Sequence, residues 1–158
     1  MPYDQRPQVE LENEKLRLTL LPGGGHIASI TLKENGVNPL WNPPWETIDP
    51  STFDPEIHDG FGDPAEARLL SGIVGHNLCF DFFGPPSEQE VAAGLTAHGE
   101  TSVLDWAVTA GDGELVANVE LPRTRMRFER RLLAPPNANF VKITETATNL
   151  TDMDRPVG

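Results

Sequence analysis

Residues 104–121 read LDWAVTAGDGELVANVEL, and this stretch decides the fold. Its apolar residues alternate with other residues on both sides of the Gly-Asp-Gly sequence at 111–113. The alternating apolar positions are Leu104, Trp106, Val108, Leu115, Ala117, Val119 and Leu121. Such alternation is typical of strands with one buried face, and glycine-rich turn residues between two such runs predict a β-hairpin.

The same alternation continues towards both ends of the chain. It predicts further strands at residues 15–21, 27–33, 126–132 and 140–149, separated by turns rich in glycine, proline and asparagine. A short helical turn is expected only at Pro64–Leu70. We therefore predict an all-β fold, an antiparallel β-sandwich.

The length, charge and composition of the chain favour a single globular domain that does not bind nucleic acid. The 158 residues suffice for one domain, and the formal net charge of −12 disfavours nucleic acid because its phosphates would be repelled. No apolar run is long enough to cross a bilayer, and the N-terminus lacks the hydrophobic core of a signal peptide. The single cysteine, Cys79, excludes an intrachain disulfide. We expect a cytoplasmic protein that binds neither nucleic acid nor membrane.

The sharpest candidate for chemistry is His98-Gly99-Glu100. In a strand, His98 and Glu100 would point to the same face and could together bind a polyol or ligate a metal ion. The alternative is a partly buried histidine that is satisfied by the neighbouring carboxylate.

A second histidine, His76, follows a glycine in the sequence Gly75-His76-Asn77. It could line the same pocket as His98, or it could be buried against an apolar face together with Leu78 and Phe80. His26 and His58 are expected at the surface. A metal site built from His26, His76, His98 and Glu100, as in a cupin-like protein, is a further alternative.

Residues 38–63 break the alternation and are rich in proline and aromatic residues. We expect an ordered loop that forms a pocket wall, in which Trp41 and Trp45 offer indole faces for a sugar to stack on. Alternatively, these aromatics only anchor the loop. The sequence holds no nucleotide-binding motif, no serine-nucleophile motif and no paired cysteines, so no cofactor is expected.

Three segments, taken in order, resemble the aldose 1-epimerase (galactose mutarotase-like) proteins. They are residues 11–41, LENEKLRLTLLPGGGHIASITLKENGVNPLW, residues 71–84, SGIVGHNLCFDFFG, and residues 93–100, AGLTAHGE. The resemblance implies a β-supersandwich in which His98 matches the histidine that contacts the sugar. His76 stands where a typical member has an arginine, which puts the usual substrate preference in question.

The family also uses a second histidine as the acid on the ring oxygen and a late glutamate as the base on the anomeric hydroxyl. Neither is matched here, so we assign no catalytic residue. The resemblance implies that residues 1–158 form a single β domain that is the incomplete N-terminal part of a larger supersandwich, inactive on its own.

The predicted function is accordingly that of a mutarotase-like protein that binds a small carbohydrate and interconverts its anomers by acid–base ring opening. The predicted substrate-binding residues are His98, His76, Glu100, Trp41 and Trp45. A non-catalytic carbohydrate-binding module is the alternative. A half-built sheet would also leave an open edge, which predicts self-association.

Overall fold

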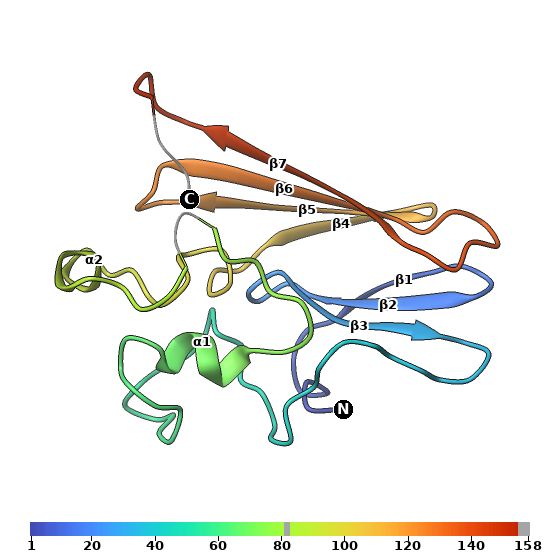
Figure 1. Cartoon of the computed structure of the whole chain (residues 1–158), viewed down its shortest axis with the longest axis horizontal. Helices are drawn as coiled ribbons and strands as arrows, with labels where there is room; N and C mark the ends of the chain where they lie inside the picture. The colour runs from blue at the N-terminus through green and yellow to red at the C-terminus, as the bar shows by residue number, and fades with distance from the viewer. Residues whose placement is uncertain (81–82, 155–158) are drawn as a thin grey trace.

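The structure is a computed structural model that describes residues 1–80 and 83–154. Within these residues, seven strands form two antiparallel sheets that face each other (Figure 1). The first sheet has the order β1-β2-β3 and contains β1 (Val9–Glu12), β2 (Leu16–Leu21) and β3 (His26–Leu32). The second has the order β4-β5-β6-β7 and contains β4 (Ala107–Gly111), β5 (Glu114–Leu121), β6 (Met126–Leu133) and β7 (Lys142–Asn149). The predicted all-β antiparallel architecture is confirmed.

The core lies between the two sheets, as the alternation in the sequence predicts. In β5, Leu115, Ala117, Val119 and Leu121 are all buried, and the residues between them are not. These side chains join Leu18 and Leu20 of β2 and Phe128 of β6 in one hydrophobic cluster. The hairpin predicted from residues 104–121 forms with Gly111 paired to Glu114, although its first strand begins at Ala107 rather than at Leu104.

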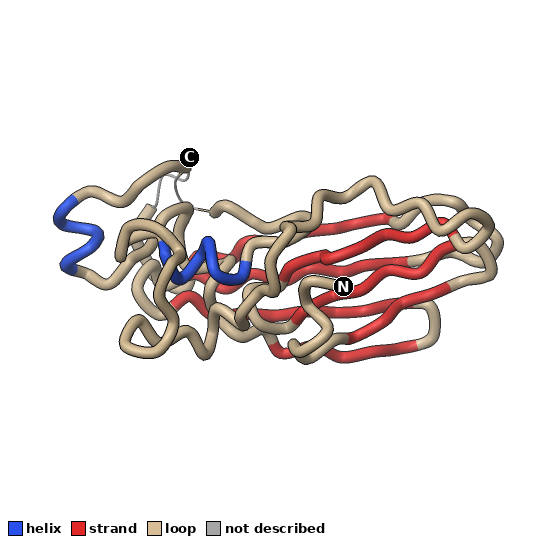
Figure 2. Tube along the Cα trace, turned by 90° about the horizontal axis from the view of Figure 1, so that it is seen from below, coloured by secondary structure: helices blue, strands red, loops and turns tan. Residues whose placement is uncertain are grey.

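The two helices lie with most of the connecting loops at one end of the sandwich (Figure 2). Helix α1 (Ala67–Gly72) forms close to the helical turn expected at Pro64–Leu70. Helix α2 (Glu88–Ala92) was not predicted. Its signal was nevertheless in the sequence, because Ser87 and Glu90 form a capping box in which each side chain accepts a hydrogen bond from the other's backbone N–H.

The long loop before α1 is ordered by contacts with the N-terminus and with α1. The buried Arg6 guanidinium donates hydrogen bonds to Thr47 Oγ1, to the Gly72 carbonyl and to the Gly23 carbonyl. Burial lowers the pKa of Arg6 to about 10, an effect that the nearby Asp49 carboxylate opposes. Arg6 thereby joins the start of the chain, the proline-rich loop and the turn before β3.

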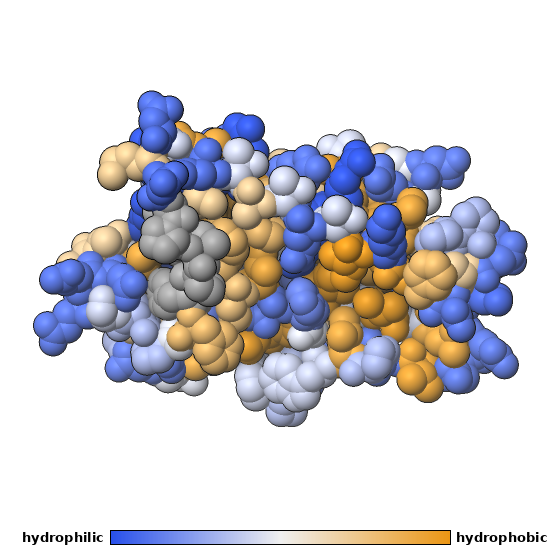
Figure 3. All heavy atoms as spheres, turned by 45° about the horizontal axis from the view of Figure 1, so that its top comes forward, coloured by the Kyte–Doolittle hydropathy of each residue, from blue (hydrophilic) through white to orange (hydrophobic). Residues whose placement is uncertain are grey.

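The outer edge of β7 is open in the described part of the chain. All eight β7 residues are exposed, and β7 pairs only with β6 there. Leu133, Phe140 and Ile143, which lie on or beside β6 and β7, are more than one third exposed, and Figure 3 shows a broad apolar area where this side of the molecule comes forward. The strand contains no proline, and its glutamate, Glu145, is paired with Arg130, so little protects the edge from pairing with another strand.

We therefore expect the 158-residue chain to self-associate through β7. In a symmetric antiparallel pairing, the β7 strands of two copies of the chain lie side by side with Thr146 of one opposite Thr146 of the other. The same face of each strand then points to the same side, and Thr144 lies opposite Thr148. Substituting Thr146→Glu places like charges opposite each other and should shift sedimentation velocity profiles towards the monomer. The matched control is Thr109→Glu on exposed β4, which should leave self-association unchanged. A wild-type chain that stays monomeric at every concentration would contradict this prediction.

Candidate functional site

A buried arginine on the inner face of the second sheet organises the candidate site. Arg130 of β6 has no exposed surface and lies directly opposite Glu145 of β7 in the strand register. Its Nε donates to Glu145 Oε1 at 2.8 Å, and its Nη2 lies 2.7 Å from the same oxygen. Its Nη1 donates to the carbonyl of Gly25 at 2.7 Å, so the guanidinium also reaches the turn before β3.

Trp106 packs against this guanidinium and is itself held in place. The Arg130 Cζ lies 5.4 Å from the centroid of the indole, which is the geometry of a cation–π contact. The indole Nε1 donates to the carbonyl of Thr101 at 2.9 Å. Gly25 has a φ of 61°, and a Cβ there would lie 2.4 Å from the indole ring. Only glycine therefore fits at this point of contact between the two sheets.

His76 lies at the exposed border of this cluster. Its backbone forms an antiparallel bridge with Ile27, with N–H···O distances of 3.0 and 2.9 Å. Partial burial lowers the pKa of His76, the positive charge of Arg130 lowers it further, and Glu145 opposes both. The imidazole is thus neutral near pH 7 and can both donate and accept a hydrogen bond. The alternative of a histidine buried on an apolar face is wrong, because the residue is exposed.

His98 lies in a turn and not in the predicted strand. Its φ is 63° and that of Gly99 is 86°, so the backbone cannot continue as a strand and the expected shared face of His98 and Glu100 does not form. The His98 Nδ1 accepts a hydrogen bond from the Gly84 N–H at 3.1 Å, and the ring packs against Phe83 with centroids 4.5 Å apart. In the neutral ring Nε2 therefore carries the proton, so this atom is a donor.

Glu100 is buried, and its carboxylate holds the turn between β5 and β6. It accepts hydrogen bonds from the Thr124 N–H at 2.9 Å and from the Arg123 N–H at 3.2 Å. The Arg123 guanidinium is a further neighbour at 3.5 Å. These protein donors engage the carboxylate, and a role for Glu100 in binding substrate stays a prediction.

The structure brings the segments of the two predicted histidines side by side. The carbonyl of Leu78 accepts hydrogen bonds from the hydroxyls of Thr101, at 2.6 Å, and Ser102, at 2.5 Å. A Cβ on Gly99 would lie 2.3 Å from the carbonyl of Phe80, so these two backbones are in direct contact. No hydrogen bond joins the His76 and His98 imidazoles within the described residues.

Trp41 and Trp45 form an exposed aromatic pair next to the His76 segment. Their ring centroids are 6.0 Å apart in a T-shaped arrangement, and the residues are 53% and 42% exposed. The carbonyl of Trp41 accepts a hydrogen bond from the Gly75 N–H at 2.8 Å, immediately before His76. These indoles thus leave ring surface available to a ligand.

The other two histidines do not join the cluster. His26 was expected at the surface, but the structure buries it completely because it begins β3. Burial lowers the pKa of His26 to about 3, and the charge of Arg6 contributes. His58 Nδ1 accepts a hydrogen bond from the Asp54 N–H within its own loop. The metal site considered from the sequence is not assembled, since no three histidine, cysteine or carboxylate side chains among the described residues could share an ion.

Arg130 and Glu145 were not predicted as site residues, although each carries a recognisable signal in the sequence. Phe128 and Leu132 define the buried face of β6, and Arg130 occupies the position between them on that face. Glu145 likewise shares a face with Ile143 and Ala147. A charged residue in the apolar phase of a strand pattern indicates a buried ion pair or a binding site.

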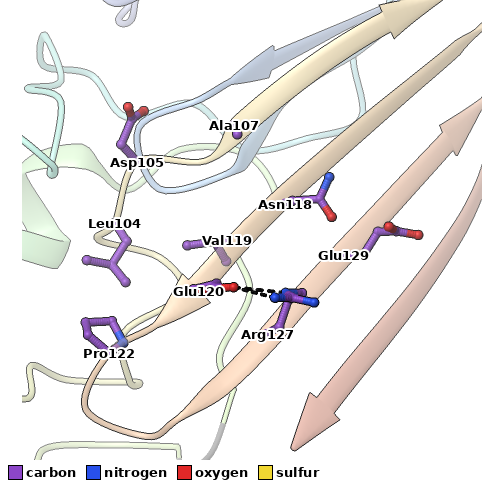
Figure 4. A pocket seen from close by; sticks show the side chains of 9 residues that line it. All are labelled: Leu104, Asp105, Ala107, Asn118, Val119, Glu120, Pro122, Arg127 and Glu129. Atoms are coloured by element: carbon purple, nitrogen blue, oxygen red, sulfur yellow. Dashed lines mark hydrogen bonds and ion pairs between the residues drawn. The ribbon is translucent and has the colours of Figure 1, made fainter. Parts of the chain in front are cut away.

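A separate hollow lies on the outer face of the second sheet and is shown in Figure 4. It has a volume of about 670 Å³ and includes Asn118, Glu120, Arg127 and Glu129 in its lining. The Glu120 carboxylate accepts a hydrogen bond from Arg127 Nε at 3.1 Å, which Figure 4 marks. These residues alternate with the core residues of β5 and β6, so the hollow is on the opposite side of the sheet from Arg130.

Comparison with known proteins identifies the fold. No protein-family model matches the chain, and no curated protein matches its sequence. The structure is similar to the crystal structure of a galactose mutarotase-like protein from Lactobacillus casei ATCC 334, with a TM-score of 0.58 and 14% identity. The match covers 90% of this chain and 44% of that one, so this chain spans less than half of the length of that protein. The fold is thus a galactose mutarotase-like β-sandwich. Among the described residues, no helix has the length and apolar character needed to cross a membrane.

The electrostatic coupling of His76 predicts how its pKa responds to substitution. Glu145→Gln removes the charge that opposes Arg130, so the pKa of His76 should fall further. Arg130→Met removes a positive neighbour, so the same pKa should rise. NMR titration of the imidazole C–H signals measures both, with the His58 signal as the reference that should not differ between variants. Identical His76 titrations in all three proteins would show that the cluster does not form.

The burial of His26 predicts a loss of stability in acid. Its pKa is about 3 in the folded chain and about 6.5 when unfolded, so protonation favours the unfolded state. The stabilisation is complete above pH 6.5 and is lost as the pH falls towards 3. His26→Gln keeps a donor for the Ser102 carbonyl but cannot titrate, so its free energy of unfolding should fall less between pH 6.5 and 4. Urea unfolding at several pH values tests this, and parallel profiles for both proteins would refute it.

Proposed function

We propose that this chain carries part of a carbohydrate-binding face, as a mutarotase-like protein would, with the sugar bound over His76. The observation that carries the proposal is the position of His76, a neutral exposed imidazole close to the ion pair of buried Arg130 and partly exposed Glu145. Glu145 is 31% exposed at its side chain, so one member of that pair can also meet a ligand. Hydrogen bonds from such groups are the usual way to bind sugar hydroxyls.

The surroundings of His76 add the apolar contact that sugars need. Trp41 is joined to the same segment by the hydrogen bond from Gly75, and its indole is half exposed. The C–H face of a pyranose can stack on such a ring. In this proposal His98 contributes through its Nε2–H, from the neighbouring segment, and Trp45 extends the aromatic wall. In this proposal Glu100 has a structural role, because its carboxylate binds the backbone of the turn between β5 and β6.

Anomer interconversion requires an acid at the ring oxygen and a base at the anomeric hydroxyl. The His98 Nδ1 and the Glu100 carboxylate already accept hydrogen bonds from the chain itself, which leaves neither poised as that base. We propose that this chain binds the sugar without turning it over, and that catalysis belongs to a larger mutarotase-like protein. Two observations support a larger domain. The edge of β7 is open, and the match covers only 44% of the similar structure, which is therefore the longer chain.

Sugar binding is tested by calorimetric titration of the chain with a panel of monosaccharides and methyl glycosides. His76→Ala should weaken binding about fivefold, since one hydrogen bond to a ligand contributes on the order of 1 kcal/mol. The matched control is His58→Ala, which removes a histidine from another loop and should bind normally. The proposal fails if no sugar binds, or if both variants bind equally well. Polarimetry on the same samples separates the binding module from an active mutarotase.

A further inference from the structure

A hollow beside the aromatic pair has no part in the site described so far. It has a volume of about 470 Å³ and lies between the proline-rich loop and helix α1. The residues that line it are Trp45, Gly60, Phe61, Gly62 and Leu70. A volume of this size is within the range of small-molecule sites, and its lining contains no charged side chain.

The lining is held by residues that are themselves fixed. Phe61 packs edge-on against Phe53 with centroids 6.4 Å apart, and Phe53 is buried. Leu70 is part of α1, and its carbon Cδ1 would be 3.2 Å from a Cβ on Gly62. A Cβ on Gly60 would meet no atom within 4 Å, so this position leaves the space open. The apolar walls are thus preorganised, and glycine keeps the mouth free of side chains.

The hollow is linked to the His76 segment through the pair of Trp41 and Trp45. Trp45 forms its wall and contacts Trp41 at a centroid distance of 6.0 Å. Trp41 in turn is hydrogen-bonded to Gly75, the residue before His76. A ligand bound over His76 and stacked on Trp41 could therefore extend a substituent past Trp45 into the hollow.

We propose that this hollow is a subsite for an apolar substituent of the bound sugar, an aryl or alkyl group, for which the aglycone of a synthetic glycoside serves as the probe. The inference rests on the proposed sugar-binding function and specifies the class of ligand. A lining of apolar side chains favours such a group over a phosphate, a carboxylate or a second polar sugar ring, because each of these would lose hydration and gain few partners there. The subsite thus makes the ligand a sugar that carries an apolar group rather than an unsubstituted monosaccharide.

The test compares matched glycosides that differ only in the aglycone. Phenyl and methyl β-D-galactopyranoside, and the corresponding glucosides, are titrated into the full chain by calorimetry. We expect the phenyl glycoside of the bound sugar to bind about tenfold more tightly, from the apolar area of one ring removed from water. Trp45→Ala should abolish this preference and Trp45→Phe should retain it. Trp41→Ala is the matched control, and it should weaken both glycosides by the same factor.

A second readout separates the subsite from the sugar site. In protein labelled with 5-fluorotryptophan, the phenyl glycoside should shift the ¹⁹F signal of Trp45, whereas the methyl glycoside should not. The signal of the buried Trp106 serves as the reference. Equal affinity of both glycosides, with an unmoved Trp45 signal, overturns the subsite and leaves the sugar-binding proposal standing. If no glycoside binds, both proposals fall, and benzyl alcohol alone then shows whether the hollow takes an apolar group without a sugar.

Discussion

The buried guanidinium of Arg130 is the interaction on which the arrangement of the two sheets depends. A cation without solvent contact would cost several kcal/mol if it were left unpaired. Here it meets the Glu145 carboxylate on one side, the Gly25 carbonyl on another and the Trp106 ring on a third. Glu145 belongs to the second sheet and Gly25 to the turn that leads into the first. Satisfying the charge therefore requires the sheets to be placed correctly relative to each other, which a purely apolar interface would specify less strictly.

The same charge also determines the chemistry available at the border of the core. Because Arg130 is fully buried and Glu145 is 31% exposed at its side chain, the pair extends from the interior to the solvent. His76 lies within the influence of both charges, and the lowered pKa of its imidazole keeps that ring neutral. A neutral imidazole beside a held carboxylate offers both a donor and acceptors to a hydroxyl group. The structural tie and the candidate binding face thus meet at Glu145, which belongs to both.

The sequence predicts the architecture well because strand alternation is a local property. In residues 104–121 and 126–132, the alternating apolar residues indicate which face of each strand is buried. The turn residues between these runs indicate where each strand ends. The pair of Arg130 and Glu145 could not be found this way, because it depends on the register between β6 and β7. His98 was expected to share a face with Glu100 in a strand, but the structure has a positive φ at both His98 and Gly99. His26 was placed at the surface because three glycines precede it, although the strand that it begins, β3, is buried over its first four residues.

Gly75 explains why His76 and the aromatic pair of Trp41 and Trp45 are found together. Its N–H donates to the Trp41 carbonyl, and the next residue pairs with Ile27 of β3. Its φ is 60°, and a Cβ would lie 2.0 Å from the Ile27 carbonyl oxygen, so no other residue fits without moving the strand. One glycine thus fixes His76 against the first sheet and fixes Trp41 against His76. Arg130 is held two residues before Ile27, at the carbonyl of Gly25, so His76 and Arg130 are both anchored near the start of β3. The contacts of Arg6 fix another part of the proline-rich loop, at Thr47.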